Sequence, residues 1–145
     1  MKNSKSISLE IIALCNYAEF TMNGKFNIIG VFDQQMINKT IGLWPHGFIV
    51  FTIKTKVKNI TKKIQLQIIN EASKAILDTA LSVHIGENGK ANFIFEFANL
   101  KIEDYGKYNI RLTDPDDEDA YIGSTEVTVF LGEINGGPEK KSRVN

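Results

Sequence analysis

Five carboxylates crowd into the segment TDPDDEDAY, residues 113–121, and this is the part of the sequence best suited to chemistry. Carboxylate oxygens on one short loop are the ligands that hard cations such as Ca²⁺ take in proteins. The spacing differs from that of a helix–loop–helix calcium site, and no glycine supplies its sharp turn. Without a cation, an ordered loop would need Lys or Arg nearby to offset the repulsion. The candidate metal ligands are Asp114, Asp116, Asp117, Glu118 and Asp119.

A solvated charged loop between two strands is the alternative interpretation of 113–121, and the clustering of like charges favours it. If the loop did bind a ligand, the protein would be a small cation- or carbohydrate-binding module, with Ca²⁺ as the cation. No other cofactor is expected.

Histidine and cysteine offer little chemistry in this chain. His46 and His84 are the only histidines and Cys15 is the only cysteine. A zinc site or a nucleophile–base pair needs more partners than these, so we expect no catalytic residues and a protein that is not an enzyme. We place His84 on the polar face of a strand and His46 in a turn. Cys15 is expected to be an inert buried thiol, and the absence of a second cysteine favours a reducing compartment.

Balanced charge limits the classes of partner. The 145 residues include 17 Lys plus Arg and 17 Asp plus Glu, so the formal net charge is zero. Nucleic-acid binding depends on an excess of basic side chains, and we expect no nucleic-acid partner. Glu10 interrupts the N-terminal apolar run, and no run approaches the ~20 apolar residues that span a bilayer. We expect an unprocessed, cytoplasmic chain with no membrane partner.

Apolar and polar residues alternate with a period of two in the segments 62–68, 76–85, 92–97, 107–112 and 124–131. This period gives each strand one face for a core and one for water, as in antiparallel sheets. Eight strand-like runs at short spacing indicate two packed sheets. We predict an all-β fold: an immunoglobulin-like antiparallel β-sandwich of about seven to nine strands over residues 1–132. A flexible, polar tail is expected over 133–145.

Turn-forming residues separate these runs. Asn23-Gly24 and Asn88-Gly89 lie where a hairpin needs residues that tolerate positive φ. Further turns are predicted at Pro45-His46-Gly47 and around residues 72–74.

Three segments, 7–18, 26–32 and 48–53, are apolar on both faces or nearly so. A strand of this kind usually lies in the middle of a sheet or carries a second buried surface, such as a subunit interface. The side chains that test this expectation are Ile12, Leu14, Ile29 and Val31.

Asp104, Gly106, Tyr108 and Ile110 have the spacing D-x-G-x-Y-x-hydrophobic. This spacing resembles the tyrosine corner of immunoglobulin-like sandwiches, in which the tyrosine hydroxyl bonds to the backbone just upstream. Ile110 stands where antibody domains have a cysteine. Trp44 precedes the apolar run 48–53, so an antibody-type domain is not expected.

The segments 15–35, 44–54 and 103–112 together resemble a family of small uncharacterised bacterial proteins. Its members share an N-G-K-x-N-I-x-G-x-F-[DE] segment, matched here by residues 23–33. The resemblance implies an immunoglobulin-like sandwich and a bacterial or phage origin. It implies no activity and no catalytic residues.

The segment 33–47 is predicted to be the longest irregular stretch, and it is unusually apolar for a loop. It either covers one end of the sandwich or forms a partner-binding surface with a tryptophan anchor. The candidate partner-binding residues are Met36, Ile41, Leu43 and Trp44. Together with the two-sided strands, they lead to the principal hypothesis: a non-enzymatic protein-binding or assembly module that binds a protein partner or a second copy of itself.

Overall fold

The computed structural model describes residues 2–132. The predicted tail, 133–145, lies outside this range. Within it, no helix has the length and apolar character needed to cross a membrane. The elements are β1 (Ile7–Phe20), β2 (Phe26–Phe32), β3 (Gln34–Asn38), β4 (Leu43–Thr55), β5 (Ile60–Asn70), β6 (Ala75–Ile85), β7 (Lys90–Lys101), β8 (Gly106–Asp114), the short 3₁₀-helix η1 (Pro115–Asp117) and β9 (Ala120–Gly132).

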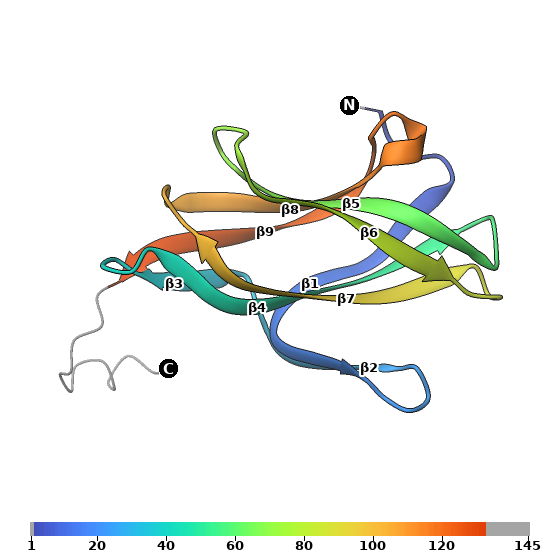
Figure 1. Cartoon of the computed structure of the whole chain (residues 1–145), viewed down its shortest axis with the longest axis horizontal. Helices are drawn as coiled ribbons and strands as arrows, with labels where there is room; N and C mark the ends of the chain where they lie inside the picture. The colour runs from blue at the N-terminus through green and yellow to red at the C-terminus, as the bar shows by residue number, and fades with distance from the viewer. Residues whose placement is uncertain (1, 133–145) are drawn as a thin grey trace.

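Two sheets pack face to face in an immunoglobulin-like β-sandwich, with β8 and β5 in one layer and β4 and β7 in the other (Figure 1). The smaller sheet has the strand order β2-β1-β4-β7, and the larger has the order β3-β9-β8-β5-β6. The all-β fold and the strand number agree with the prediction. One strand pairing differs from the predicted antiparallel pattern, because β3 runs parallel to β9. The chain leaves the smaller sheet at Asp33, and β3 then joins the larger sheet in the same direction as β9.

The alternating segments bury most of the side chains that their periodicity predicts, although Leu131 at the end of 124–131 is exposed. Ile64, Leu66 and Ile68 of β5 are buried, and so are Ile110 and Leu112 of β8. These side chains pack with apolar residues of β1, β4 and β7 in one cluster between the two sheets. Each buried side chain of this size contributes about 1.5–3 kcal/mol, so the cluster is the main source of stability.

Two of the three two-sided segments lie inside a sheet, as predicted. β4 lies between β1 and β7, and its residues 48–53 are all buried. β1 lies between β2 and β4, with Leu14 and Cys15 buried on opposite faces. The third segment, β2, is an edge strand.

The prediction of a loop over 33–47 is wrong, because this segment contains β3 and the start of β4. β3 has only five residues and begins with two glutamines, so its alternation is too short to recognise. Ile37 in this strand is nevertheless fully buried.

The predicted turn at 45–47 is also wrong, since these residues continue β4 and place His46 in a strand. Proline lacks the N–H that a ladder needs and is confined to unpaired strand positions. Pro45 meets this condition on both sides. On one side, the pairing of β4 with β1 ends at Phe48, so Pro45 has no partner there. On the other side, the residue of β7 opposite Pro45 is Asn99, which has φ 54° and is left out of the ladder.

The predicted hairpin at Asn23-Gly24 joins β1 to β2. The Gly24 N–H donates to the Thr21 carbonyl at 2.9 Å, and the Thr21 N–H donates to the Lys25 carbonyl at 2.8 Å. Gly24 has φ 77°, a left-handed conformation that glycine adopts without a steric penalty. The turns at 72–74 and 88–89 are likewise confirmed.

The hydrogen bond expected of a tyrosine corner is present. The Tyr108 hydroxyl donates to the Asp104 carbonyl at 2.6 Å, and the Tyr108 side chain is buried. This bond attaches the loop before β8 to the core.

The substitution Tyr108→Phe removes this hydrogen bond and leaves the ring packing in place. A net loss of about 1 kcal/mol in the free energy of unfolding is expected, measured by urea denaturation. Tyr105→Phe is the matched control, because Tyr105 is partly exposed and surface changes stay within about 0.5 kcal/mol. Equal effects of the two substitutions would contradict a structural role for the corner.

Candidate functional site

The acidic segment binds lysine within its own chain. Asp114 is buried, and the Lys62 Nζ donates to it at 2.6 Å and to Asp116 at 2.8 Å. The Asp114 carboxylate also caps η1 by accepting the Asp116 N–H at 3.0 Å. The Lys62 ammonium therefore lies where a cation would have to bind these two carboxylates. Nearby lysine is what an ordered loop without a metal requires.

The remaining acidic residues do not complete a metal site. Asp117 accepts a hydrogen bond from the Lys2 Nζ at 2.7 Å. Glu118 and Asp119 have φ values of 54° and 56° and are exposed. Across residues 2–132, no three His, Cys, Asp or Glu side chains form a group that could hold a metal ion. The predicted ligand set is thus divided between two lysines and solvent.

The predicted partner-binding set is also separated by the fold. Trp44 is fully buried, with its ring 5.0 Å from Phe97 in an edge-to-face arrangement. Met36 and Leu43 are half-buried, and Ile41 is exposed in the turn between β3 and β4. The anchor role assigned to Trp44 is therefore incorrect, because β4 extends further than predicted and carries the ring into the core.

An exposed apolar surface lies instead on the outer face of the four-stranded sheet. Tyr17 pairs with Ile29, and Cys15 pairs with Val31, so these side chains share a face. Cys15 is buried beneath this surface, and burial raises the pKa of its thiol, as expected for an unreactive cysteine. The exposed side chains, which we call the hairpin surface, are Ile11, Tyr17, Ile29 and Val31.

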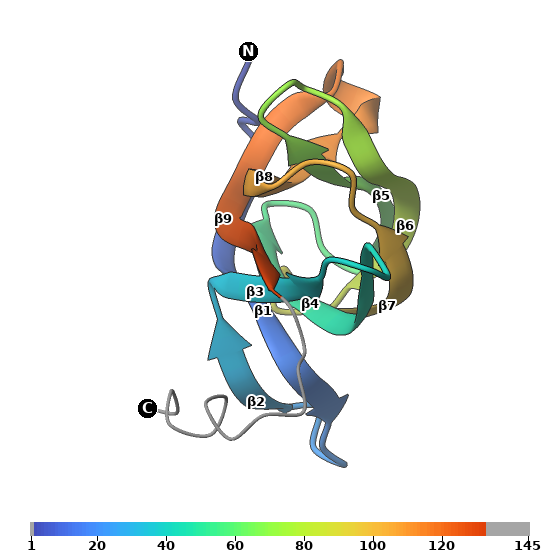
Figure 2. The same cartoon turned by 90° about the vertical axis from the view of Figure 1, so that its left-hand side faces the viewer.

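The hairpin surface continues a packed layer. Phe48 and Val50 of β4 are buried in a second apolar cluster with Cys15, on the side away from the main core. Tyr17 packs edge-to-face on Phe48 at 5.5 Å. Ile29 and Val31 are respectively 61% and 66% exposed, so the layer is open to solvent at β2. Figure 2 shows the β1–β2 hairpin projecting beyond the rest of the sandwich.

The free edge of β2 lacks the features that prevent strands from pairing. Edge strands are usually short, or carry charges or proline. β7 carries Lys90, Glu96 and Lys101, β6 carries Asp78, and β3 has only five residues. β2 has seven residues, FNIIGVF, with neither charge nor proline.

The hydrogen-bonding pattern shows which backbone groups of β2 face solvent. The bond from Thr21 to Lys25 makes these residues a hydrogen-bonded pair, and such pairs alternate along an antiparallel ladder. Asn27, Ile29 and Val31 therefore direct their N–H and C=O groups toward β1. Phe26, Ile28 and Phe32 direct theirs outward, away from the sheet.

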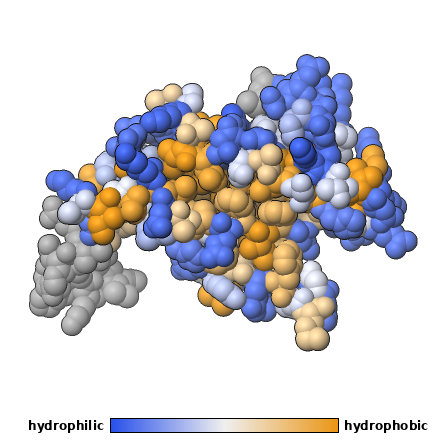
Figure 3. Space-filling view, in the orientation of Figure 1, coloured by the Kyte–Doolittle hydropathy of each residue, from blue (hydrophilic) through white to orange (hydrophobic). Residues whose placement is uncertain are grey.

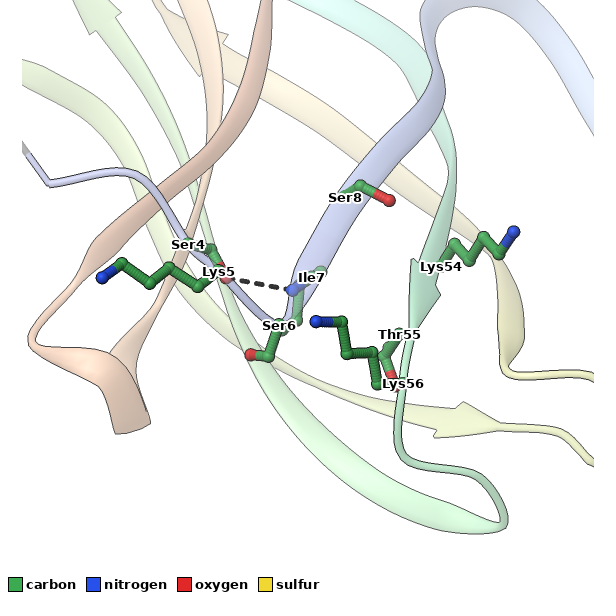
Figure 4. A pocket seen from close by; sticks show the side chains of 8 residues that line it. All are labelled: Ser4, Lys5, Ser6, Ile7, Ser8, Lys54, Thr55 and Lys56. Carbon is green, nitrogen blue, oxygen red and sulfur yellow. Dashed lines mark hydrogen bonds between the residues drawn. The ribbon is translucent and has the colours of Figure 1, made fainter.

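Two other hollows are weaker candidates. A pocket of about 290 Å³ lies between residues 4–8 and the end of β4 (Figure 4). In Figure 4, Lys5 and Lys54 point to opposite sides, and only Lys56 points toward the N-terminal segment. The three charges therefore do not converge on one anion.

Figure 3 shows hydrophobic side chains gathered over the middle of another face, where β6 and β7 lie.

A polar pocket of about 300 Å³ lies on the outer face of the five-stranded sheet, with Asp119 at its border. Its side chains bond mainly to one another. The Arg111 Nη2 donates to the Gln67 Oε1 at 2.9 Å, and the Gln67 Nε2 donates to Asp78 at 3.2 Å. Gln65 also donates to Asp78. These internal bonds satisfy the polar cluster only in part, because the Arg111 Nε is buried and has no hydrogen-bond partner among residues 2–132.

The fold and this surface define a type of architecture, a β-sandwich with one open apolar hairpin. The chain belongs to a family of unknown function, DUF6941, whose model matches residues 10–128. A comparison with curated proteins found no match.

Two solved structures illustrate the similarity at the level of the chain trace. One is the CARDB domain of the PF1109 protein from Pyrococcus furiosus, in complex with di-metal ions; the TM-score is 0.44 at 13% identity, covering 90% of this chain and all of that one. The other is a β-glucuronidase from Bifidobacterium dentium complexed with coumarin-3-O-glucuronide. Its TM-score is 0.42 at 10% identity, covering 87% of this chain and 18% of that one.

Removing the lysine from the acidic segment should destabilise the fold. In Lys62→Met, Asp114 would stay buried without its ion partner, and breaking a buried pair in this way costs about 3 kcal/mol. Lys63→Met is the matched control, because Lys63 is exposed on the adjacent position. Chemical denaturation of the two variants provides the comparison. Equal stability of the two, or recovery of Lys62→Met by added Ca²⁺ alone, would contradict this role of Lys62.

The pH dependence of this contribution follows from the two pKa shifts. The hydrogen bond and charge of Lys62 lower the pKa of Asp116. Burial disfavours the charged form of Lys62 and lowers its pKa. The hydrogen bonds and charges of Asp114 and Asp116 have the larger combined effect, so the pKa of Lys62 is raised. The Asp116 contribution is therefore complete above the ordinary pKa of about 4 and is lost as pH falls through the lowered value. The Lys62 contribution is complete below the ordinary pKa of about 10.4 and is lost as pH rises through the raised value.

We expect the stability difference between wild type and Lys62→Met to be largest near neutral pH. It should shrink at high pH, where the Lys62 ammonium loses its proton, and at low pH, where Asp116 and the unpartnered Asp114 of the variant are protonated. Urea denaturation at several pH values measures it. A difference that did not shrink at low pH would contradict the assignment.

Proposed function

We propose that this protein is a non-enzymatic binding or assembly module that engages another polypeptide through the β1–β2 hairpin. The observation that carries the proposal is the position of β2. A strand with apolar residues on both faces lies at an edge, and its Ile29 and Val31 side chains are exposed. Within residues 2–132, no strand pairs with the outer side of β2. By contrast, the side chains of Ile12 and Leu14 on β1 are mostly or fully covered by other residues of the same chain.

The chemistry of this surface suits a β-strand as the partner. An edge strand presents alternating N–H and C=O groups, which another strand satisfies completely by adding to the sheet. Apolar side chains beside the edge then gain burial against the partner, and each large one contributes about 1.5–3 kcal/mol when fully covered. A small molecule could satisfy only part of this row. The alternative of cation binding has no comparable support, because Lys62 and Lys2 already bind the carboxylates.

A charge placed on the hairpin surface should abolish binding. The full chain is purified under native conditions from the cells that produce it, and its mass is measured by light scattering. We expect a mass above the 16.3 kDa of the single chain, and a return to that mass in Val31→Lys. Because Val31 is exposed, the substitution should change the stability of the fold by no more than about 0.5 kcal/mol.

Val57→Lys is the matched control, since Val57 is 54% exposed in the loop between β4 and β5. This variant should keep the wild-type mass. Ile41→Lys tests the alternative surface near β3, because Ile41 is 63% exposed. A wild-type mass of 16.3 kDa, or equal loss of binding in Val57→Lys, would contradict the proposal.

A further inference from the structure

We propose that the strand that pairs with β2 is β2 of a second copy of this chain, in an antiparallel arrangement with a twofold axis at Ile29. This inference rests on the proposed function and names the partner of the same hairpin. It follows from the self-complementarity of the strand in backbone bonding, side-chain size and charge.

Backbone bonding restricts the register. Phe26, Ile28 and Phe32 point their backbone groups outward, so an added antiparallel strand must form its hydrogen-bonded pairs at even-numbered residues. In an antiparallel pair of identical strands, each register has a constant sum of the two opposing residue numbers. Because the hydrogen-bonded residues are even-numbered in both copies, this sum must be even. A sum of 58 places Phe26 opposite Phe32 and Ile28 opposite Gly30 of the other copy. Every residue of β2 then has a counterpart. Gly30 has φ 69° and is absent from the β1–β2 ladder, so it must adopt an extended conformation to pair with Ile28, a change that glycine allows.

The side chains can be placed in the same register. Gly30 has no side chain, and the Asn16 side chain of β1 lies over it, so Ile28 of the other copy would pack against Asn16. Ile29 lies on the axis and faces its own counterpart. Val31 lies opposite Asn27, the residue next to Glu19 at the hairpin end. The two hairpin surfaces then join in one apolar layer across an eight-stranded sheet, because the four-stranded sheet of each copy becomes continuous with the other.

Charge selects this register over its neighbours. Lys25 and Asp33 flank β2 immediately on either side, and both are exposed. In the described part of the chain, neither has an ion-pair partner. A sum of 58 places each Lys25 opposite Asp33 of the other copy. A shift by one pair in either direction would instead place Lys25 opposite Val31, or Asp33 opposite Asn27.

The shape of the molecule permits the approach. The end of the hairpin projects beyond the sandwich (Figure 2), so two copies can align β2 strands with their bodies on opposite sides. An arrangement of this kind is isologous and closes at two copies. It removes the unprotected edge from both.

A cysteine on the axis tests the geometry directly. Ile29 would face its counterpart as a non-hydrogen-bonded pair, with Cα atoms about 4.5 Å apart, which is within the range of a disulfide. Ile29→Cys should therefore form a covalent dimer under mild oxidation, seen on a non-reducing gel. Val57→Cys, with a similarly exposed thiol in the β4–β5 loop, should remain monomeric at the same concentration. Both variants keep the buried Cys15.

Charge reversal tests the register independently. Lys25→Asp would place two like charges together at each end of the paired strands, and the dimer dissociation constant should rise roughly tenfold. The double variant Lys25→Asp, Asp33→Lys restores opposite charges and should recover most of the affinity. Equal weakening in the single and double variants would overturn the proposed register.

The outcomes separate this inference from the proposed function. A mass twice that of the chain together with the Ile29→Cys disulfide supports both. A larger mass that comes from a different polypeptide overturns the second copy as partner but leaves the hairpin as a binding surface. A doubled mass without the disulfide also overturns the β2 pairing. A lone 16.3 kDa chain overturns both proposals.

Discussion

Every backbone N–H and C=O group removed from water must find a hydrogen-bonding partner, and this requirement governs the whole molecule. In the nine strands of residues 2–132 it is met by the ladders between neighbouring strands. Pro45 can occupy β4 because neither ladder calls for its missing N–H at that position. At β2, the backbone groups that face β1 are paired, and in the described part of the chain those of the outer edge face solvent. The apolar character of this edge makes it the place where a further strand would complete the sheet.

Charge is distributed differently in the acidic segment and at the hairpin. The acidic segment is the densest cluster of charge, yet Lys62 and Lys2 neutralise its most closely held carboxylates within the chain. Asp114 serves as a buried cap of η1, which is a structural role. At the hairpin, β2 carries no charge; Lys25 and Asp33 flank it, and Glu19 of β1 accepts hydrogen bonds from Tyr17 and Asn27. A surface of this composition loses little by desolvation when it is covered, which favours a protein partner.

Much of the fold could be predicted from the sequence because alternation with a period of two is direct evidence of a half-buried strand. Ile64, Leu66 and Ile68 illustrate this, since their burial follows from spacing alone. The Asn23-Gly24 hairpin and the Tyr108 hydrogen bond were equally accessible, as local motifs determine both. β3 escaped prediction because a five-residue strand with two glutamines has too little periodicity, and Trp44 was misplaced as a consequence.

The candidate site was harder to predict, because it depends on the order of strands in the sheet. The composition of 26–32 indicated a strand needing cover on both faces. Only the pairing of β1 with both β2 and β4 shows that β2 lies at an edge and that Ile29 and Val31 lack this cover. The position of Lys62 beside Asp114 is likewise a contact across 52 residues. No local pattern in either segment specifies it.

Amide hydrogen exchange along β2, measured at high and low protein concentration, tests the central claim most directly. Asn27, Ile29 and Val31 bond to β1 and should be protected at both concentrations. If the edge is covered by a strand, the amides of Phe26, Ile28 and Phe32 should be protected at high concentration and should exchange rapidly on dilution. Rapid exchange of these three amides at every concentration, with the sandwich core fully protected, would contradict the account.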